Sequence, residues 1–112
     1  MDREAEKRRL RAGSFRINNG RVLYTINLLR ERYNDLRSVE KALSYGGMER
    51  QSFLDSVNFL AEEGYIHLRT IDGKGDAALS DHAYQTLEAR VSGKGIRLLG
   101  GGISDNMIDL GS

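Results

Sequence analysis

The stretch that decides the fold is GGMERQSFLDSVNFLAEEGYIHLR, which spans residues 46–69. After the glycine turn, Phe53, Val57 and Leu60 recur at the i, i+4 and i+7 spacing of one helical face. Gly64 ends this helix, because glycine readily adopts the left-handed conformation that follows a helix C-terminus. The residues after Gly64 alternate between apolar and polar, which is typical of a half-buried strand. The stretch therefore predicts a turn, a helix and a strand in that order.

Two apolar stripes precede the glycine turn and predict two further helices. The first stripe follows a helix cap at Asn18 or Asn19, and its members are Val22, Ile26, Leu29 and Tyr33. The second stripe is shorter and follows the break at Asn34-Asp35, and its members are Leu36, Val39 and Leu43. With the helix around Phe53, these stripes predict a three-helix core.

A hairpin is expected after Gly64. Ile66 and Leu68 alternate with His67 and Arg69, the run from 72 to 76 supplies turn residues, and the second strand returns at Ala77 and Leu79. Ser80 or Asp81 then caps a last helix that ends at Ser92-Gly93, and its apolar face consists of Tyr84, Leu87 and Val91.

These patterns predict an α+β fold with a three-helix core, a two-stranded β-hairpin and a C-terminal helix. The domain organisation that they indicate is a basic flexible leader over 1–17, a folded domain over 18–92 and a glycine-rich apolar tail over 93–112. The tail is apolar enough to cover its own domain or that of a partner, and its glycines permit either arrangement. A frayed, disordered end is the other interpretation.

The composition indicates the cellular compartment and excludes several kinds of site. The 112 residues suit one domain, and the absence of cysteine excludes disulfides, zinc-finger sites and thiol nucleophiles. No apolar run approaches the ~18 residues that span a bilayer, and the charged N-terminus lacks the apolar region of a signal peptide. We expect a cytoplasmic protein that is neither secreted nor inserted in a membrane.

The serial order of these parts resembles a winged helix-turn-helix domain. Ala42 and Gly46 occupy the small-residue and turn-glycine positions, although Gly47 makes the turn one residue longer than its tightest form. The junction EEGYI over 62–66 and the exit LSDHAYQTLEARV over 79–91 resemble the entry to the wing and the segment that follows it. The resemblance implies DNA binding, with the third helix in the major groove and the wing on phosphates or the minor groove.

A narrower resemblance covers about residues 18–98. Small winged-helix proteins of Mu-like phages and prophages have this architecture and a glycine-containing tail similar to VSGKGIRLLG over 91–100. The chain departs from that pattern at Ala83 and Tyr84, where glycine is common. Because those proteins have no assigned activity, this resemblance implies a fold and a prophage setting.

The candidate DNA contacts come from three regions, on the roles that the winged-helix resemblance gives them. Arginine recognises guanine, glutamine recognises adenine, and basic side chains neutralise phosphates. In the third helix the candidates are Arg50, Gln51, Ser52 and Asp55; in the wing they are His67, Arg69 and Lys74; in the leader they are Lys7, Arg8, Arg9 and Arg11.

Charge opposes this reading at the third helix. Residues 49–63 sum to −3, with Glu49 and Asp55 near the end that should approach the bases, whereas residues 1–21 sum to +4. Non-specific DNA affinity comes almost entirely from neutralised phosphates, and the pI of 8.1 is modest for a DNA-binding domain. A homodimer would offset the deficit, because two basic leaders would then contact one duplex.

Enzyme chemistry is not indicated. His67 and His82 have no nucleophile or metal-ligand spacing beside them, and glycine follows both Lys74 and Lys94 where a phosphate-binding loop requires Ser or Thr. We expect no cofactor and no metal. The sequence thus predicts a homodimeric DNA-binding regulator from a bacterium or prophage. The alternative is a protein-interaction adaptor that presents an acidic third helix with Leu54 and Phe59 as exposed anchors.

Overall fold

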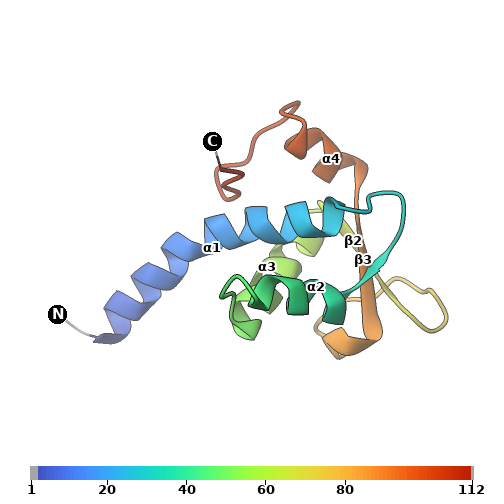
Figure 1. Cartoon of the computed structure of the whole chain (residues 1–112), viewed down its shortest axis with the longest axis horizontal. Coiled ribbons are helices and arrows are strands. Elements are labelled where there is room, and N and C mark those ends of the chain that lie inside the picture. Colours follow the sequence, from blue (N-terminus) through green and yellow to red (C-terminus); the bar gives the residue numbers. More distant parts are fainter. Residues whose placement is uncertain (1–2, 112) are drawn as a thin grey trace.

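The fold is seen in a computed structural model that describes residues 3–111, with the backbone alone for residues 7–13. This part of the chain is α+β, and its strands form a three-stranded antiparallel sheet in the order β1-β3-β2 with helices packed beside it (Figure 1). The elements in chain order are α1 (Arg3–Asn27), β1 (Asn34–Asp35), α2 (Leu36–Ser44), α3 (Arg50–Glu62), β2 (Ile66–Thr70), the 3-10 turn η1 (Tyr84–Thr86), β3 (Leu87–Val91) and α4 (Gly93–Leu99).

The helices on either side of the glycine turn form as predicted. Asp35 caps α2 by accepting hydrogen bonds from the Ser38 amide at 2.9 Å and the Ser38 hydroxyl at 2.8 Å. The predicted stripe of α3 is fully buried. Gly64 ends α3 with φ +81°, and in the turn it is Gly47, at φ +93°, rather than Gly46 that adopts the left-handed conformation.

The first helix differs from the prediction at both ends. It begins at Arg3 and not at Asn18 or Asn19, so residues 3–17 belong to α1 instead of forming a flexible leader. This segment consists largely of strong helix formers, and acids in its first turn interact favourably with the helix dipole. At the other end α1 stops at Asn27, where the Asn34 side-chain amide donates to the Ile26 carbonyl at 3.2 Å. Leu29 lies beyond the helix and is 44% exposed.

The predicted last helix, from its cap at Ser80 or Asp81 to its end at Ser92-Gly93, is wrong. Residues 87–91 form β3, the central strand, in which Ala89 lies opposite both Asn34 of β1 and Leu68 of β2. Leu87 and Val91 are four residues apart, a spacing that fits a helical face and also the same face of a strand. Residues 87–91 form a strand and not a helix because they pair with β1 on one edge and with β2 on the other.

The hairpin is correspondingly wider than predicted. Ala77 and Leu79 do not form its second strand but lie in a long loop over 71–86, partly buried against the core. An isolated antiparallel β-bridge pairs Arg69 of β2 with Asp76 of this loop. The predicted two-stranded hairpin is therefore a three-stranded sheet whose two longer strands are joined by the loop.

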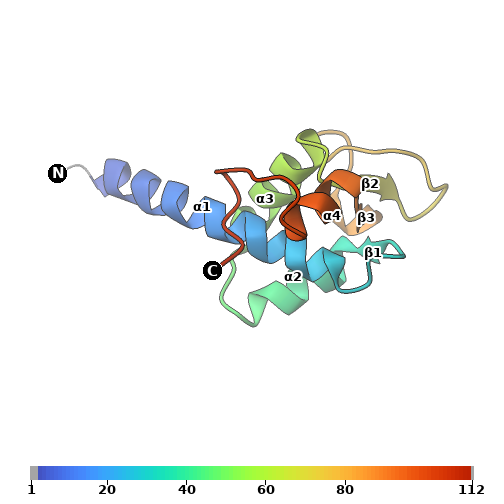
Figure 2. The same cartoon turned by 90° about the horizontal axis from the view of Figure 1, so that it is seen from above.

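The C-terminal tail packs on its own domain. Ser92 caps α4, and the chain then returns along α1 (Figure 2), where the Asn19 side-chain amide donates to the Met107 carbonyl at 2.9 Å and the Asp109 amide donates to the Arg16 carbonyl at 2.9 Å. Tyr65 donates a 2.6 Å hydrogen bond to Asp105. The composition of the tail permits it to cover either its own domain or that of a partner. In the structure it covers its own domain.

In the described residues, no helix combines the length and apolar character required to cross a membrane.

The close contact between α4 and β3 gives a stability prediction. A Cβ at Gly95 would lie 2.7 Å from Val91 Cγ1 and closer still to the Tyr65 carbonyl oxygen. We expect Gly95→Ala to lower the free energy of unfolding by ~1–3 kcal/mol, the usual cost of overpacking, as measured by urea denaturation. The control is Gly75→Ala, because nothing lies within 4 Å of its Cβ position. Equal stabilities for the two variants would contradict this packing.

Candidate nucleic-acid interface

The outward side of α3 is polar and acidic. Its residues are linked one turn apart: Gln51 Nε2 donates to Asp55 Oδ1 at 2.9 Å, and Asn58 Nδ2 donates to Glu62 Oε1 at 3.3 Å. We name Gln51, Asp55, Asn58 and Glu62 the acidic strip. Asp55 is thus held by Gln51, and Glu49 is exposed at the N-cap without a side-chain cap hydrogen bond. The acidic strip contains no cation, so it repels a phosphate backbone.

The other two candidates on α3 lie on opposite sides of the helix. Arg50 points toward α2, where its Nε lies 3.3 Å from Glu40 Oε1 and its guanidinium lies 5.6 Å from the centroid of the Tyr84 ring. Ser52 lines a separate hollow between α1 and α3. The structure therefore does not bring Arg50, Gln51 and Ser52 onto one surface.

Arg50 instead belongs to an open groove of about 600 Å³, which we name the α2–α3 groove. Its lining residues are Asp35, Arg37, Ser38, Glu40, Lys41, Arg50, Tyr84 and Gln85. Both of its acids are engaged within the chain, because Asp35 caps α2 and Glu40 pairs with Arg50.

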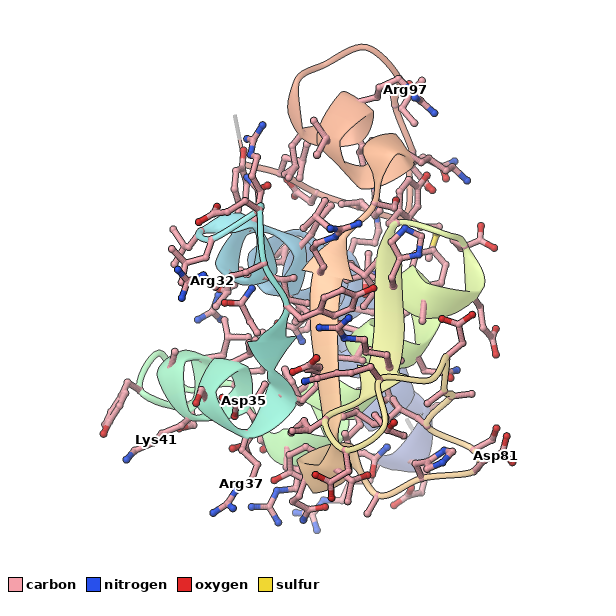
Figure 3. All side chains as sticks on the ribbon, turned by 90° about the vertical axis from the view of Figure 1, so that its right-hand side faces the viewer. Arg32, Asp35, Arg37, Lys41, Asp81 and Arg97 are labelled. Atoms are coloured by element: carbon pink, nitrogen blue, oxygen red, sulfur yellow. The ribbon has the colours of Figure 1, made fainter. Side chains whose placement is uncertain are left out.

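Two cations of the α2–α3 groove remain available. Arg37 and Lys41 are exposed, and their side chains form no hydrogen bond or ion pair with any described residue. Figure 3 shows both side chains extending from the same edge of α2, with Asp81 on the opposite edge of the molecule. The i, i+4 spacing brings their Cβ atoms within about 6 Å of each other. Together with Arg50 they make this edge of the molecule cationic.

The wing cations are neutralised within the sheet. Glu88 is only 8% exposed, and its carboxylate lies 2.5 Å from Arg69 Nε and 3.2 Å from Lys74 Nζ. Burial raises the pKa of Glu88, but the hydrogen bonds and charges of Arg69 and Lys74 outweigh this and lower the pKa below its ordinary value. The Arg69 guanidinium also stacks 3.6 Å from the centroid of the Tyr33 ring.

His67, the third wing candidate, is exposed opposite Arg90 of β3. The loop between β2 and β3 adds no net positive charge, since Lys74 stands there with Asp72, Asp76 and Asp81. Arg69 and Lys74 balance the buried Glu88, so β2 and this loop have little positive charge left for phosphates.

The basic leader lies on the part of α1 that projects from the body of the molecule (Figures 1 and 2). Its candidates Lys7, Arg8, Arg9 and Arg11 stand within little more than one turn of continuous helical backbone. Helix formation fixes the spacing of these residues, so this basic segment is a rod rather than an arm that follows a groove freely.

Sequence reasoning missed Arg37 and Lys41. The apolar stripe of the second helix predicts only its buried side, although the four-residue spacing of these cations on its polar side is a signal in the sequence. The engagement of Arg50 by Glu40 and of Lys74 by Glu88 carried no comparable signal, because those partners are ten and fourteen residues apart.

Among the described residues, no three side chains of His, Asp or Glu come together as a metal site. The chain matches no protein-family model, no curated protein and no solved structure.

The ion-pair cluster at Glu88 predicts a pH-dependent stability. A carboxylate with a lowered pKa in the folded state stabilises the fold fully above the ordinary range of ~4.3, and this contribution is lost as pH falls through the lowered value. We expect Glu88→Gln to cost ~1–3 kcal/mol at pH 7 and less at pH 3, as measured by denaturant unfolding at both pH values.

The control is Glu62→Gln, because Glu62 is exposed on the acidic strip. This substitution should change stability by less than ~0.5 kcal/mol at either pH. A Glu88→Gln deficit that is the same at pH 7 and pH 3 would show that the charge of Glu88 does not stabilise the sheet.

Proposed function

We propose that this chain is a winged-helix protein that binds duplex DNA, chiefly through phosphate contacts along the α2–α3 groove, and that it serves as a small bacterial or prophage transcription regulator. The observation that carries this proposal is the pair of exposed cations without acidic partners, Arg37 and Lys41, beside Arg50. Electrostatic contacts of this kind supply most non-specific DNA affinity.

The arrangement of elements supports the winged-helix part of the proposal. α2 and α3 are joined by the short turn over 45–49, and α3 runs through Gly64 directly into β2 and the wing loop. β1 adds a third strand on the far side of β3, which leaves the relation between α3 and the wing unchanged.

The charge distribution selects the edge of α2 over the outward side of α3. Arg37 and Lys41 gain phosphate contacts without losing an ion pair in the protein. Arg69 and Lys74 would have to leave Glu88, and a buried carboxylate without partners is costly. The acidic strip would need to approach phosphates with no cation of its own. The α2–α3 groove is therefore the surface that meets DNA at the lowest electrostatic cost.

The basic half of α1 provides a second set of phosphate contacts in this proposal. Residues 3–11 carry five basic and two acidic side chains on a helix that reaches beyond the body. These contacts are independent of sequence and add to the salt dependence of binding.

The adaptor alternative loses the anchors that it required. Leu54 and Phe59 are partly buried and pack against the core, and the Phe59 ring meets the Phe15 ring edge-to-face at 5.4 Å. What remains exposed on α3 is the acidic strip, which lacks the apolar residues that usually dominate a protein interface. DNA binding is therefore favoured over the adaptor function for this chain.

The test is a fluorescence anisotropy titration of a labelled duplex over a range of salt concentrations. The double variant Arg37→Ala, Lys41→Ala removes two phosphate contacts, so the slope of log K against log salt should fall by about 1.8 and affinity by roughly tenfold. The matched control is Arg97→Ala, because Arg97 is also exposed and lies far from Arg37 and Lys41 on the same face (Figure 3).

Two outcomes would refute the proposal. One is the absence of salt-sensitive binding to any duplex, including DNA that flanks the gene. The other is a loss of salt slope in Arg97→Ala that is half or more of the loss in the double variant, since each removed charge would then count equally and binding would depend on total charge and not on the α2–α3 groove.

A further inference from the structure

The solvent-facing side of α1 carries apolar residues where charge would be expected. The buried side of this helix includes Val22 and Ile26. Three apolar residues lie on the opposite side of the helix. Ile17 is 50% exposed, Tyr24 is 46% exposed, and Leu28, just beyond the helix end, is 80% exposed. We name these three residues the outer stripe. An amphipathic helix that packs on one side only would place polar residues there.

The N-terminal half of α1 projects from the rest of the molecule. Figures 1 and 2 both show this half of α1 extending past the other elements. Helices of about ten residues are marginal in water unless another surface packs against them. In this half Leu10 stands seven residues before Ile17, just as Tyr24 stands seven residues after it. Leu10 and Tyr24 are thus symmetric about Ile17.

We propose that the outer stripe is a homodimer interface, in which α1 of one copy packs antiparallel against α1 of a second copy around a two-fold axis at Ile17. In this register Leu10 of each copy lies opposite Tyr24 of the other. The projecting half of each helix then rests on the body of the other copy. An isologous contact of this type closes on itself and gives a dimer.

Charge decides the direction of the pairing. In a parallel pair the basic clusters over residues 7–11 would lie side by side and repel. In the antiparallel pair the cluster centres are about 24 Å apart, from eight residues on each side of the axis at ~1.5 Å per residue. This separation exceeds the screening length of about 8 Å at physiological salt, so the repulsion is largely removed.

The length of α1 sets the expected strength of the dimer. A helix of 25 residues is about 37 Å long. A contact restricted to one face over that length is at the low end of stable interfaces, ~1,200 Å² in total. The dimer is therefore expected to dissociate on dilution into the low micromolar range, in contrast to an obligate dimer.

Solution mass of the full chain without DNA tests the proposal directly. Sedimentation equilibrium at high micromolar concentration should give twice the chain mass of 12.6 kDa. Ile17→Glu, which places like charges on the two-fold axis, should give the monomer mass while circular dichroism stays native. The matched control is Met107→Glu, because Met107 is also exposed but lies on the tail beside Asn19, on the other side of α1. This control should remain a dimer.

Cross-linking tests the antiparallel register, since the chain has no cysteine of its own. An oxidised mixture of Leu10→Cys and Tyr24→Cys should form a disulfide between the two variants, whereas Leu10→Cys alone should form none, because a disulfide needs Cβ atoms about 4 Å apart. A monomer mass for the unmodified chain, a dimer unaffected by Ile17→Glu, or rapid cross-linking of Leu10→Cys with itself would each overturn the proposal. DNA takes no part in these measurements, so failure of the proposed function leaves them unaffected.

Discussion

The central position of β3 is the constraint on which the rest of the structure depends. This strand pairs with β1 on one edge and β2 on the other, so Glu88 lies opposite both Asp35 and Arg69. One face of β3 completes the core with Leu87, Ala89 and Val91, while Glu88 is buried on the other face beneath Arg69 and Lys74. Without this strand the short β1 would have no partner, and Arg69 and Lys74 would have no acid to bind. The fold and the charge distribution therefore both depend on the five residues of β3, Leu87–Val91.

The two helices around the glycine turn could be read from the sequence because every local signal agreed. The apolar spacing of Phe53, Val57 and Leu60 fits one helical face, and the positive φ of Gly64 gives that helix a clear end. The strand β2 followed for the same reason, since its alternation begins directly after this glycine.

The failures have equally specific causes. Leu87 and Val91 satisfy both the helical and the strand period, and only long-range pairing with residues 34–35 and 66–70 resolves the ambiguity. The N-terminal segment was read as a leader because its charge is high, although its helix-forming residues were equally apparent. Ion pairs between distant residues, such as Arg50 with Glu40, cannot be derived from spacing in one element.

Within the described residues, the molecule uses the cations near its sheet internally and leaves those at the edge of α2 exposed. The outward side of α3 is acidic, while the edge of α2 at Arg37 and Lys41 is cationic. The observation that most directly tests this account is a two-dimensional NMR titration of the isotope-labelled chain with a short duplex. The account predicts salt-sensitive shifts in the amides of residues 37–41, with little change in residues 55–62 of the acidic strip. Shifts concentrated in residues 55–62, with residues 37–41 unchanged, would contradict it.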